Sequence, residues 1–131
     1  MDSERLGAVA RTHRIRLLLQ FGSTVTGRTH PGSDVDLAVL LDRRPESLDA
    51  QLDLVSDVAS LLPGREADVS IINGADPLFL KQVTERCRLL YGSERALHEL
   101  QIYAWKRYQD HRRFLAMERE YVVRKVDAVG R

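Results

Sequence analysis

The chain has 131 residues, a single cysteine and a formal net charge of +1. This length suits one domain with a modest core, and 44% hydrophobic with 30% charged residues is typical of a globular protein, not a disordered or fibrous one. One cysteine excludes an internal disulfide and a cysteine metal cluster. No apolar run approaches the roughly 18 residues of a membrane span, and the N-terminus lacks a signal peptide. We therefore expect a cytoplasmic protein without a membrane partner.

The charge is unevenly divided along the chain. Residues 1–80 carry 8 Lys and Arg against 12 Asp and Glu, a balance of −4, whereas residues 81–131 carry 12 against 7, a balance of +5. An acidic first part suits a metal site. A basic tail suits an anionic partner, protein or nucleic acid, or equally a set of solvated helix faces.

The first 72 residues predict alternating helices and strands. We expect a helix over residues 3–13, a strand over 15–21 that ends at Gly22, and a second strand over 34–41. Ser47 is a plausible N-cap for a helix that reaches Leu62. A third strand is expected over residues 66–72. The face that we expect this second helix to bury consists of Leu48, Leu52, Val55, Ala59 and Leu62.

The remaining residues predict a short helix, a short strand and one long helical tract. Asp76 is an expected N-cap with Pro77 at the first helical position, and the helix runs to about Thr84. Residues 88–91 form a short strand. The tract from residue 93 would measure roughly 50 Å, too long for so small a body, so it bends or projects to meet a partner. Its apolar stripe consists of Leu97, Leu100, Ala104, Tyr108, His111, Leu115, Val122, Val126 and Val129. We expect a single domain, with a core of residues 1–92 and a tail of residues 93–131.

Three aspartates are the candidate catalytic and metal-binding residues. Asp34 and Asp36 share one face of a strand, with their Cα atoms about 6.6 Å apart. Carboxylates at this spacing repel each other and favour a hard cation, Mg²⁺ or Mn²⁺. Asp68, on the next strand, would join them if the two strands are neighbours, either as general base or as a ligand of a second ion. The alternative is a solvated strand start and a capped strand edge.

The loop before Asp34 has the composition of a phosphate-binding segment. Gly22 follows a strand and lets the backbone approach a phosphate, while Ser23 opens a turn with free N–H groups and a hydroxyl. Arg28 is suited to pair with a phosphate oxygen. Ser33 is suited to bond a phosphate or a carboxylate. Together with the aspartates, these residues predict a nucleotidyl-transfer site.

The pattern Gly22-Ser23, ten residues, Asp34-Val35-Asp36 resembles the signature of the polymerase-β-like nucleotidyltransferases. Asp68 falls where that superfamily has its third carboxylate. The small size and the helical tail are most similar to the minimal nucleotidyltransferases of the MntA type, antitoxins that are paired with HEPN-domain toxins. One departure concerns Thr26, because family members commonly have an arginine immediately before the second glycine.

The resemblance implies an α/β (α+β) fold, a mixed sheet of about four strands flanked by helices with a long C-terminal helical tract. It also implies ATP as substrate, with one or two Mg²⁺ ions. In that group the antitoxin transfers AMP to a tyrosine of an RNase toxin and so silences it. Direct nucleic-acid binding is not expected. The tail does not carry the toxin signature, because only three residues separate Arg107 from His111.

Two other functions stay open at this stage. The chain could neutralise its partner by occlusion alone, with aromatic residues of the tail as anchors: Tyr103, Trp105, Tyr108, Phe114 and Tyr121. Transfer to a small molecule such as an aminoglycoside would need an acceptor-binding domain, and no segment of the sequence marks one.

Overall fold

The computed structural model describes residues 1–22, residue 25 and residues 34–129 of the chain. The described elements, in chain order, are α1 (Ser3–His13), β1 (Ile15–Phe21), β2 (Val35–Leu41), α3 (Leu48–Ala59), β3 (Ala67–Ile71), α4 (Pro77–Glu85), β4 (Arg88–Tyr91) and α5 (Glu94–Val129). Among these, no helix combines the length and apolar character that crossing a membrane requires.

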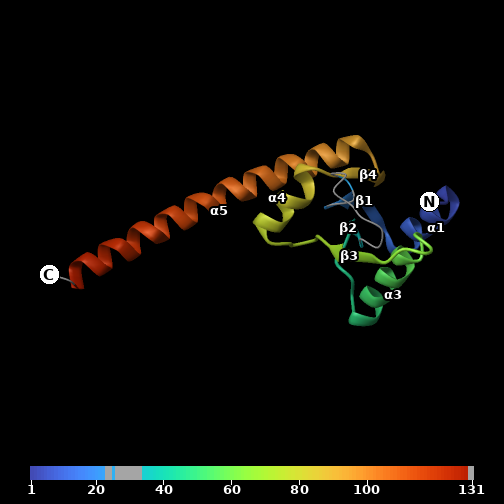
Figure 1. Ribbon diagram of the computed structural model, residues 1–131, viewed down its shortest axis with the longest axis horizontal. Helices are drawn as coiled ribbons and strands as arrows, with labels where there is room; N and C mark the ends of the chain where they lie inside the picture. The colour runs from blue at the N-terminus through green and yellow to red at the C-terminus, as the bar shows by residue number, and fades with distance from the viewer. Residues whose placement is uncertain (23–24, 26–33, 130–131) are drawn as a thin grey trace.

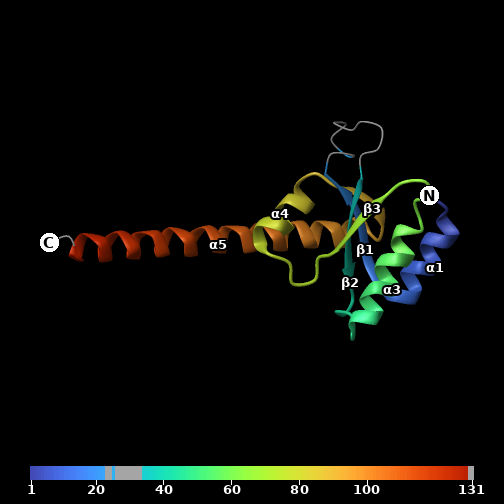
Figure 2. The ribbon, with the colours of Figure 1, turned by 60° about the horizontal axis from the view of Figure 1, so that its bottom comes forward.

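The four described strands form one mixed sheet in the order β3-β2-β1-β4. β1 pairs antiparallel with both β2 and β4, whereas β2 and β3 run parallel. The parallel pair is connected through α3, as parallel strands require a crossover. Because of this topology, the end of β1 and the beginnings of β2 and β3 meet at one end of the sheet (Figure 2).

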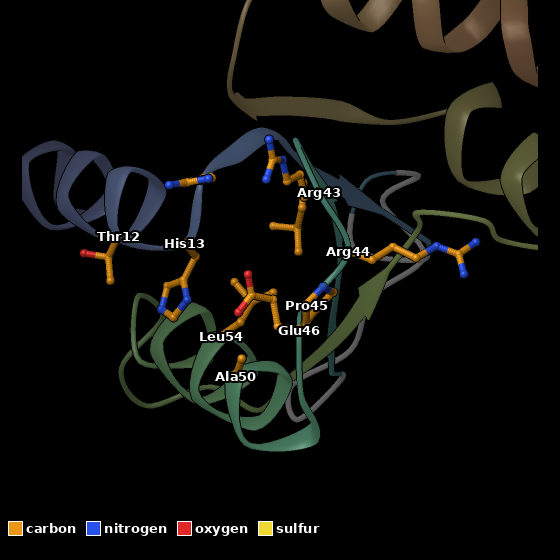
Figure 3. Close-up of a pocket in the computed structure, with 10 residues that line it drawn as sticks. Thr12, His13, Arg43, Arg44, Pro45, Glu46, Ala50 and Leu54 are labelled. Carbon is orange, nitrogen blue, oxygen red and sulfur yellow. The ribbon is translucent and has the colours of Figure 1, made fainter.

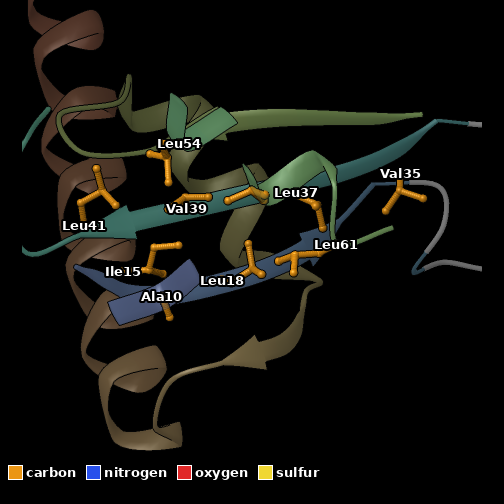
Figure 4. Close-up of a cluster of buried hydrophobic side chains, with 10 residues drawn as sticks. Ala10, Ile15, Leu18, Val35, Leu37, Val39, Leu41, Leu54 and Leu61 are labelled. Carbon is orange, nitrogen blue, oxygen red and sulfur yellow. The ribbon is translucent and has the colours of Figure 1, made fainter. Parts of the chain in front are cut away.

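Helices cover both faces of the sheet (Figures 1 and 2). On one face, α1 and α3 pack over inward side chains of β1 and β2, and Figure 4 shows this cluster with Leu18, Leu37 and Val39 at its centre. These three side chains are fully buried. Burying a leucine contributes about 2 kcal/mol relative to an exposed one, so this layer is a main source of stability.

The other face is covered by α4 and the first part of α5. Leu17, Leu19 and Ala38 of the sheet pack there against Val83 of α4 and Ala104 of α5. The side-chain amide of Gln101 also donates to the carbonyl oxygen of Thr84 at 3.2 Å. The beginning of α5 is therefore part of the core.

The rest of α5 leaves the body. The helix has 36 residues, which corresponds to about 54 Å, and it runs straight out past α4 into solvent (Figures 1 and 2). The expectation that the tract bends or projects is thus resolved in favour of projection. Of the five candidate anchor residues, Tyr103, Trp105, Phe114 and Tyr121 are exposed, whereas Tyr108 is half-buried.

Most predicted elements are confirmed, and one predicted face is wrong. The first helix, the first strand, the short fourth strand and the N-caps Ser47 and Asp76 are found as expected. The helix predicted to reach Leu62 ends at Ala59. Its predicted inner face is not the buried one, since Leu48 and Leu52 are more than half exposed while Leu54, Val58 and Leu61 are buried. Leucines and valines occur on both sides of this segment, so helical spacing alone fits either face.

Candidate active site

Two of the predicted aspartates lie side by side on adjacent strands. Asp36 of β2 and Asp68 of β3 are partners in the parallel register, so their Cα atoms belong to strands about 4.8 Å apart and their side chains share one face. This is the face that α4 and α5 cover further along, but at this end Asp68 is exposed and Asp36 only partly covered. Asp34 is exposed and lies two residues before Asp36, on the same side of the chain.

Gly22 lies directly against the Asp36 carboxylate. It has φ +80°, in the left-handed region, and a methyl group built on it would overlap Oδ2 of Asp36. The next turn is closed by the N–H of Val25, which donates to the carbonyl oxygen of Gly22 at 3.1 Å. The position after β1 therefore needs glycine for two reasons, its backbone angle and the carboxylate beside it.

An aromatic pair stands next to the carboxylates. Phe21 is the register partner of Asp36 on β1, and its ring meets that of Phe79 from α4 edge-on, with centroids 5.9 Å apart and planes at 84°. Both side chains are half-buried. Sequence reasoning missed this pair. The only local signal was an aromatic residue directly before Gly22, and the contact itself joins segments 58 positions apart.

The carboxylates perturb each other. Burial raises the pKa of Asp36 above its ordinary value, and the negative charges of Asp68 and then Asp34 raise that pKa further. Such a shift means that the ionised pair is disfavoured until a positive charge reaches it. The arrangement is suited to a bound cation.

The described residues supply only part of a metal's ligands. Among them, no group of three or more His, Cys, Asp or Glu side chains is close enough to hold one ion. A hard divalent cation commonly takes one or two carboxylates and completes its octahedron with water and substrate phosphates. Asp36 and Asp68, with Asp34 beside them, fit that incomplete type of site.

Three predicted site residues cannot be placed. Ser23, Arg28 and Ser33 lie outside the described residues, as does Thr26, so their assignment to nucleotide binding stays a prediction. Gly22, Asp34, Asp36 and Asp68 are the predicted residues that the structure brings to the same end of the sheet.

The pocket in Figure 3 is not at this site. It has a volume of about 220 Å³ and is lined by residues such as His13, Arg43, Glu46 and Leu54. Its strand residue, Leu41, is the last of β2, whereas Asp36 is near the first. At about 3.3 Å per residue the two lie roughly 17 Å apart. The pocket therefore plays no part in the carboxylate site.

A comparison with protein-family models decides the family. The model described as polymerase beta, nucleotidyltransferase, matches residues 4–96, which include the four described strands and all three candidate aspartates. The chain belongs to the polymerase beta nucleotidyltransferase family. A search of the curated proteins finds no match.

Solved structures share the fold of this nucleotidyltransferase. A toxin-antitoxin structure with AMP-PNP matches with a TM-score of 0.70 and 23% identity, over 96% of this chain and 98% of that one. A complex of a tri-AMPylated Shewanella oneidensis HEPN toxin with an MNT antitoxin matches with a TM-score of 0.63 and 22% identity, over 94% and 93%. Spectinomycin adenyltransferase from Enterococcus faecialis, with ATP and spectinomycin, matches with a TM-score of 0.55 and 16% identity, over 74% and 57%. At these identities the likeness establishes the fold, which the resemblance had predicted.

The repulsion around Asp36 predicts an unusual response to pH. The folded protein holds the Asp36 proton more tightly than the unfolded chain does, so in the absence of metal this residue's contribution to stability falls as pH rises above about 4. Asp36→Asn removes the repulsion. We expect the metal-free variant to match the wild type at pH 3, below the unfolded pKa, and to gain about 0.5 kcal/mol, or about 2 °C in Tm, at pH 7. Thermal unfolding in EDTA at the two pH values measures this.

Magnesium should reverse the order of stability of the wild type and Asp36→Asn. Addition of Mg²⁺ with ATP is expected to raise the Tm of the wild type and to leave that of Asp36→Asn nearly unchanged. A variant that is less stable than the wild type in EDTA at pH 7 would instead mean that the Asp36 carboxylate is a structural partner in the fold.

Proposed function

We propose that this nucleotidyltransferase uses Mg²⁺ and moves AMP from ATP to a tyrosine hydroxyl of a HEPN-domain toxin, an RNase, and so acts as its antitoxin. The observation that carries the proposal is the in-register pair Asp36 and Asp68 on one exposed end of the sheet. The family match supports the reaction class. The likeness to toxin–antitoxin structures, one with AMP-PNP and one with an AMPylated toxin, supports the donor and the kind of acceptor.

In the reaction, a bond forms between the acceptor oxygen and the α-phosphorus of ATP while the bond from that phosphorus to the β-phosphate bridging oxygen breaks. Pyrophosphate leaves, and the hydroxyl proton passes to a base. We assign this base to Asp68, which is exposed and therefore reachable by an acceptor. Asp34 and Asp36 would hold the metal ion and, through it, the nucleotide phosphates. Bound Mg²⁺ would neutralise phosphate charge and orient the triphosphate.

The phosphate contacts are assigned to the segment that begins at Gly22. Gly22 itself, with a left-handed backbone and no Cβ, leaves room for a close approach of the nucleotide next to Asp36. Ser23, Arg28 and Ser33 are proposed, on the sequence alone, as further nucleotide contacts. Residues 1–92, with the first part of α5 packed against them, would then form the catalytic unit, and the outer part of α5 would join it to the acceptor.

A second function, neutralisation by occlusion, is favoured by one observation. The outer part of α5 exposes large apolar side chains, among them Phe114 and Tyr121, and such residues anchor protein interfaces. Occlusion and transfer are compatible, because a protein-modifying enzyme must bind its target. Transfer to a small molecule is less favoured, since the match to the spectinomycin enzyme covers only 57% of that chain.

Radiolabel transfer tests the proposal. The chain is incubated with Mg²⁺ and the HEPN-domain protein that we expect to be encoded by the adjacent gene, once with α-labelled and once with γ-labelled ATP. We expect the acceptor to be labelled only by α-labelled ATP. The double variant Asp34→Asn/Asp36→Asn should give no label. An acceptor without label, or equal label with the double variant, would refute the proposal.

A further inference from the structure

The outer part of α5 is an uncovered arm. Every described side chain from Arg112 to Ala128 is exposed, over a length of about 25 Å, and Figures 1 and 2 show this part of the helix free of the rest of the chain. Seven of these residues are large and apolar and are 48–69% exposed: Phe114, Leu115, Met117, Tyr121, Val122, Val123 and Val126. An apolar surface of this extent on a small protein indicates a partner.

Six of these seven apolar residues form two rows. With about 100° per residue, Leu115, Val122 and Val126 fall within about 40° of one another. Phe114, Met117 and Tyr121 fall within about 60° of one another, roughly 120° around the helix from the first row. Glu118 and Lys125 project between the rows. A helix that packs against one partner helix needs a single apolar row. The two rows of the arm therefore suit contact with two partner helices.

The first row continues a contact that already exists inside the molecule. Leu100 and Ala104, buried against α4 and the sheet, lie on the same side of α5 as Leu115, Val122 and Val126. Tyr108 is the next residue along this side. The ammonium group of Lys81 from α4 lies over its ring, 4.8 Å from the ring centroid, in a cation–π contact. This side of α5, from Leu100 to Val126, is the open seam: α4 covers it as far as about Tyr108, and beyond that residue it is exposed.

The charge of the arm points to an acidic partner. Residues 112–128 carry five Lys and Arg and three Asp and Glu, a balance of +2. The outer edges of the two rows are basic and exposed, and Arg124 also pairs with Glu120 at 3.0 Å: Arg112 and Arg119 flank the first row, and Arg113 and Arg124 flank the second. Two copies of the arm would bring like net charges together, whereas an acidic rim on the partner would attract them.

A second copy of the chain also fits poorly for steric reasons. A parallel pair through the first row would place the second helix where α4 and the sheet already lie. An antiparallel pair avoids this collision but covers one row of each arm and leaves the other in water. A groove between two helices of a different protein covers both rows at once.

We propose that residues 112–128 of α5 dock in a groove between two helices of the acceptor protein, a groove with an apolar floor and an acidic rim. This rests on the proposed function only in identifying the occupant with the protein that receives AMP. The rows, the open seam and the charge are properties of this chain.

Two adjacent valines provide a matched test. Val122 is 52% exposed and lies in the first row, and Val123 is 53% exposed but lies among the charged side chains. We expect Val122→Glu to weaken binding to the HEPN-domain protein about 100-fold, because it places an unpaired charge at a buried contact. Val123→Glu should change binding less than threefold. Tyr121→Glu, in the second row, should weaken binding as Val122→Glu does. Biolayer interferometry with full-length proteins measures all three.

The outcomes separate the arm from the chemistry. The double variant Asp34→Asn/Asp36→Asn should bind as tightly as the wild type and transfer no AMP, so a failure of transfer with intact binding counts against the proposed function alone. Equal effects of Val122→Glu and Val123→Glu would overturn the docking proposal, as would an effect of Val122→Glu without one of Tyr121→Glu. It would also be overturned if light scattering shows a dimer of the isolated chain that Val122→Glu dissociates while acceptor binding is unchanged.

Discussion

Replacing Asp68 by asparagine is expected to lower the rate of AMP transfer about 10³-fold and to leave the affinity for ATP nearly unchanged. Asparagine keeps the size of the side chain but neither accepts the hydroxyl proton at neutral pH nor carries a negative charge. Asp34 and Asp36 remain to hold the nucleotide, so binding persists. Because Asp68 is exposed, the fold should tolerate the change. Single-turnover transfer gives the rate, and titration with a non-hydrolysable ATP analogue gives the affinity.

Asp53→Asn is the control for this prediction. Asp53 is an exposed carboxylate of α3, in the layer on the opposite face of the sheet. Its replacement removes the same charge and should change neither quantity. A rate for Asp68→Asn within threefold of the wild type would exclude Asp68 from the chemistry.

Gly22→Ala should abolish most activity through a single methyl group. The methyl would overlap Oδ2 of Asp36, so either the carboxylate or the strand end must move. A displacement of about 1 Å at a reacting centre commonly costs about 100-fold in rate. The left-handed angle of φ +80° adds about 1 kcal/mol of destabilisation. Transfer assays and thermal unfolding measure the two effects separately.

Gly64→Ala is the control that carries the backbone strain without the steric overlap. Gly64 has nearly the same backbone angle, φ +81°, but an added methyl would meet nothing within 4 Å. We expect the same loss of about 1 kcal/mol with full activity. Equal activity of the two alanine variants would show that the contact between Gly22 and Asp36 does not matter for catalysis.

Local chemistry explains why the elements could be predicted. The hydroxyl oxygens of Ser47 and Ser93 accept hydrogen bonds from backbone N–H groups in the first turns of α3 and α5. The Asp76 carboxylate accepts the corresponding hydrogen bond in α4. Each cap is readable from a few adjacent residues. The inner face of α3 was not readable in this way, because only the packing of α1 and the sheet selects Leu54 and Val58 over Leu48 and Leu52.

The same distinction applies to the site. Alternation along a strand predicts that Asp34 and Asp36 share a side, and it needs no knowledge of other strands. The register that sets Asp68 beside Asp36 depends on how β3 docks after α3. The contact of Phe21 with Phe79 depends on α4. Neither follows from spacing, so sequence reasoning treated the first as conditional and missed the second.

The straightness of α5 fixes how far apart recognition and chemistry take place. Leu100 is packed beneath the sheet, and Val122 lies 22 positions further along the same helix, or about 33 Å. Because the body packs against the beginning of α5, an acceptor docked on the arm would have to extend back along the helix to bring a hydroxyl to Asp68. Its groove and its modified residue would then belong to different parts of its surface. The length of α5 would set the separation between the docking site and the modified hydroxyl. An acceptor would then be selected by its own dimensions as well as by the chemistry at either end.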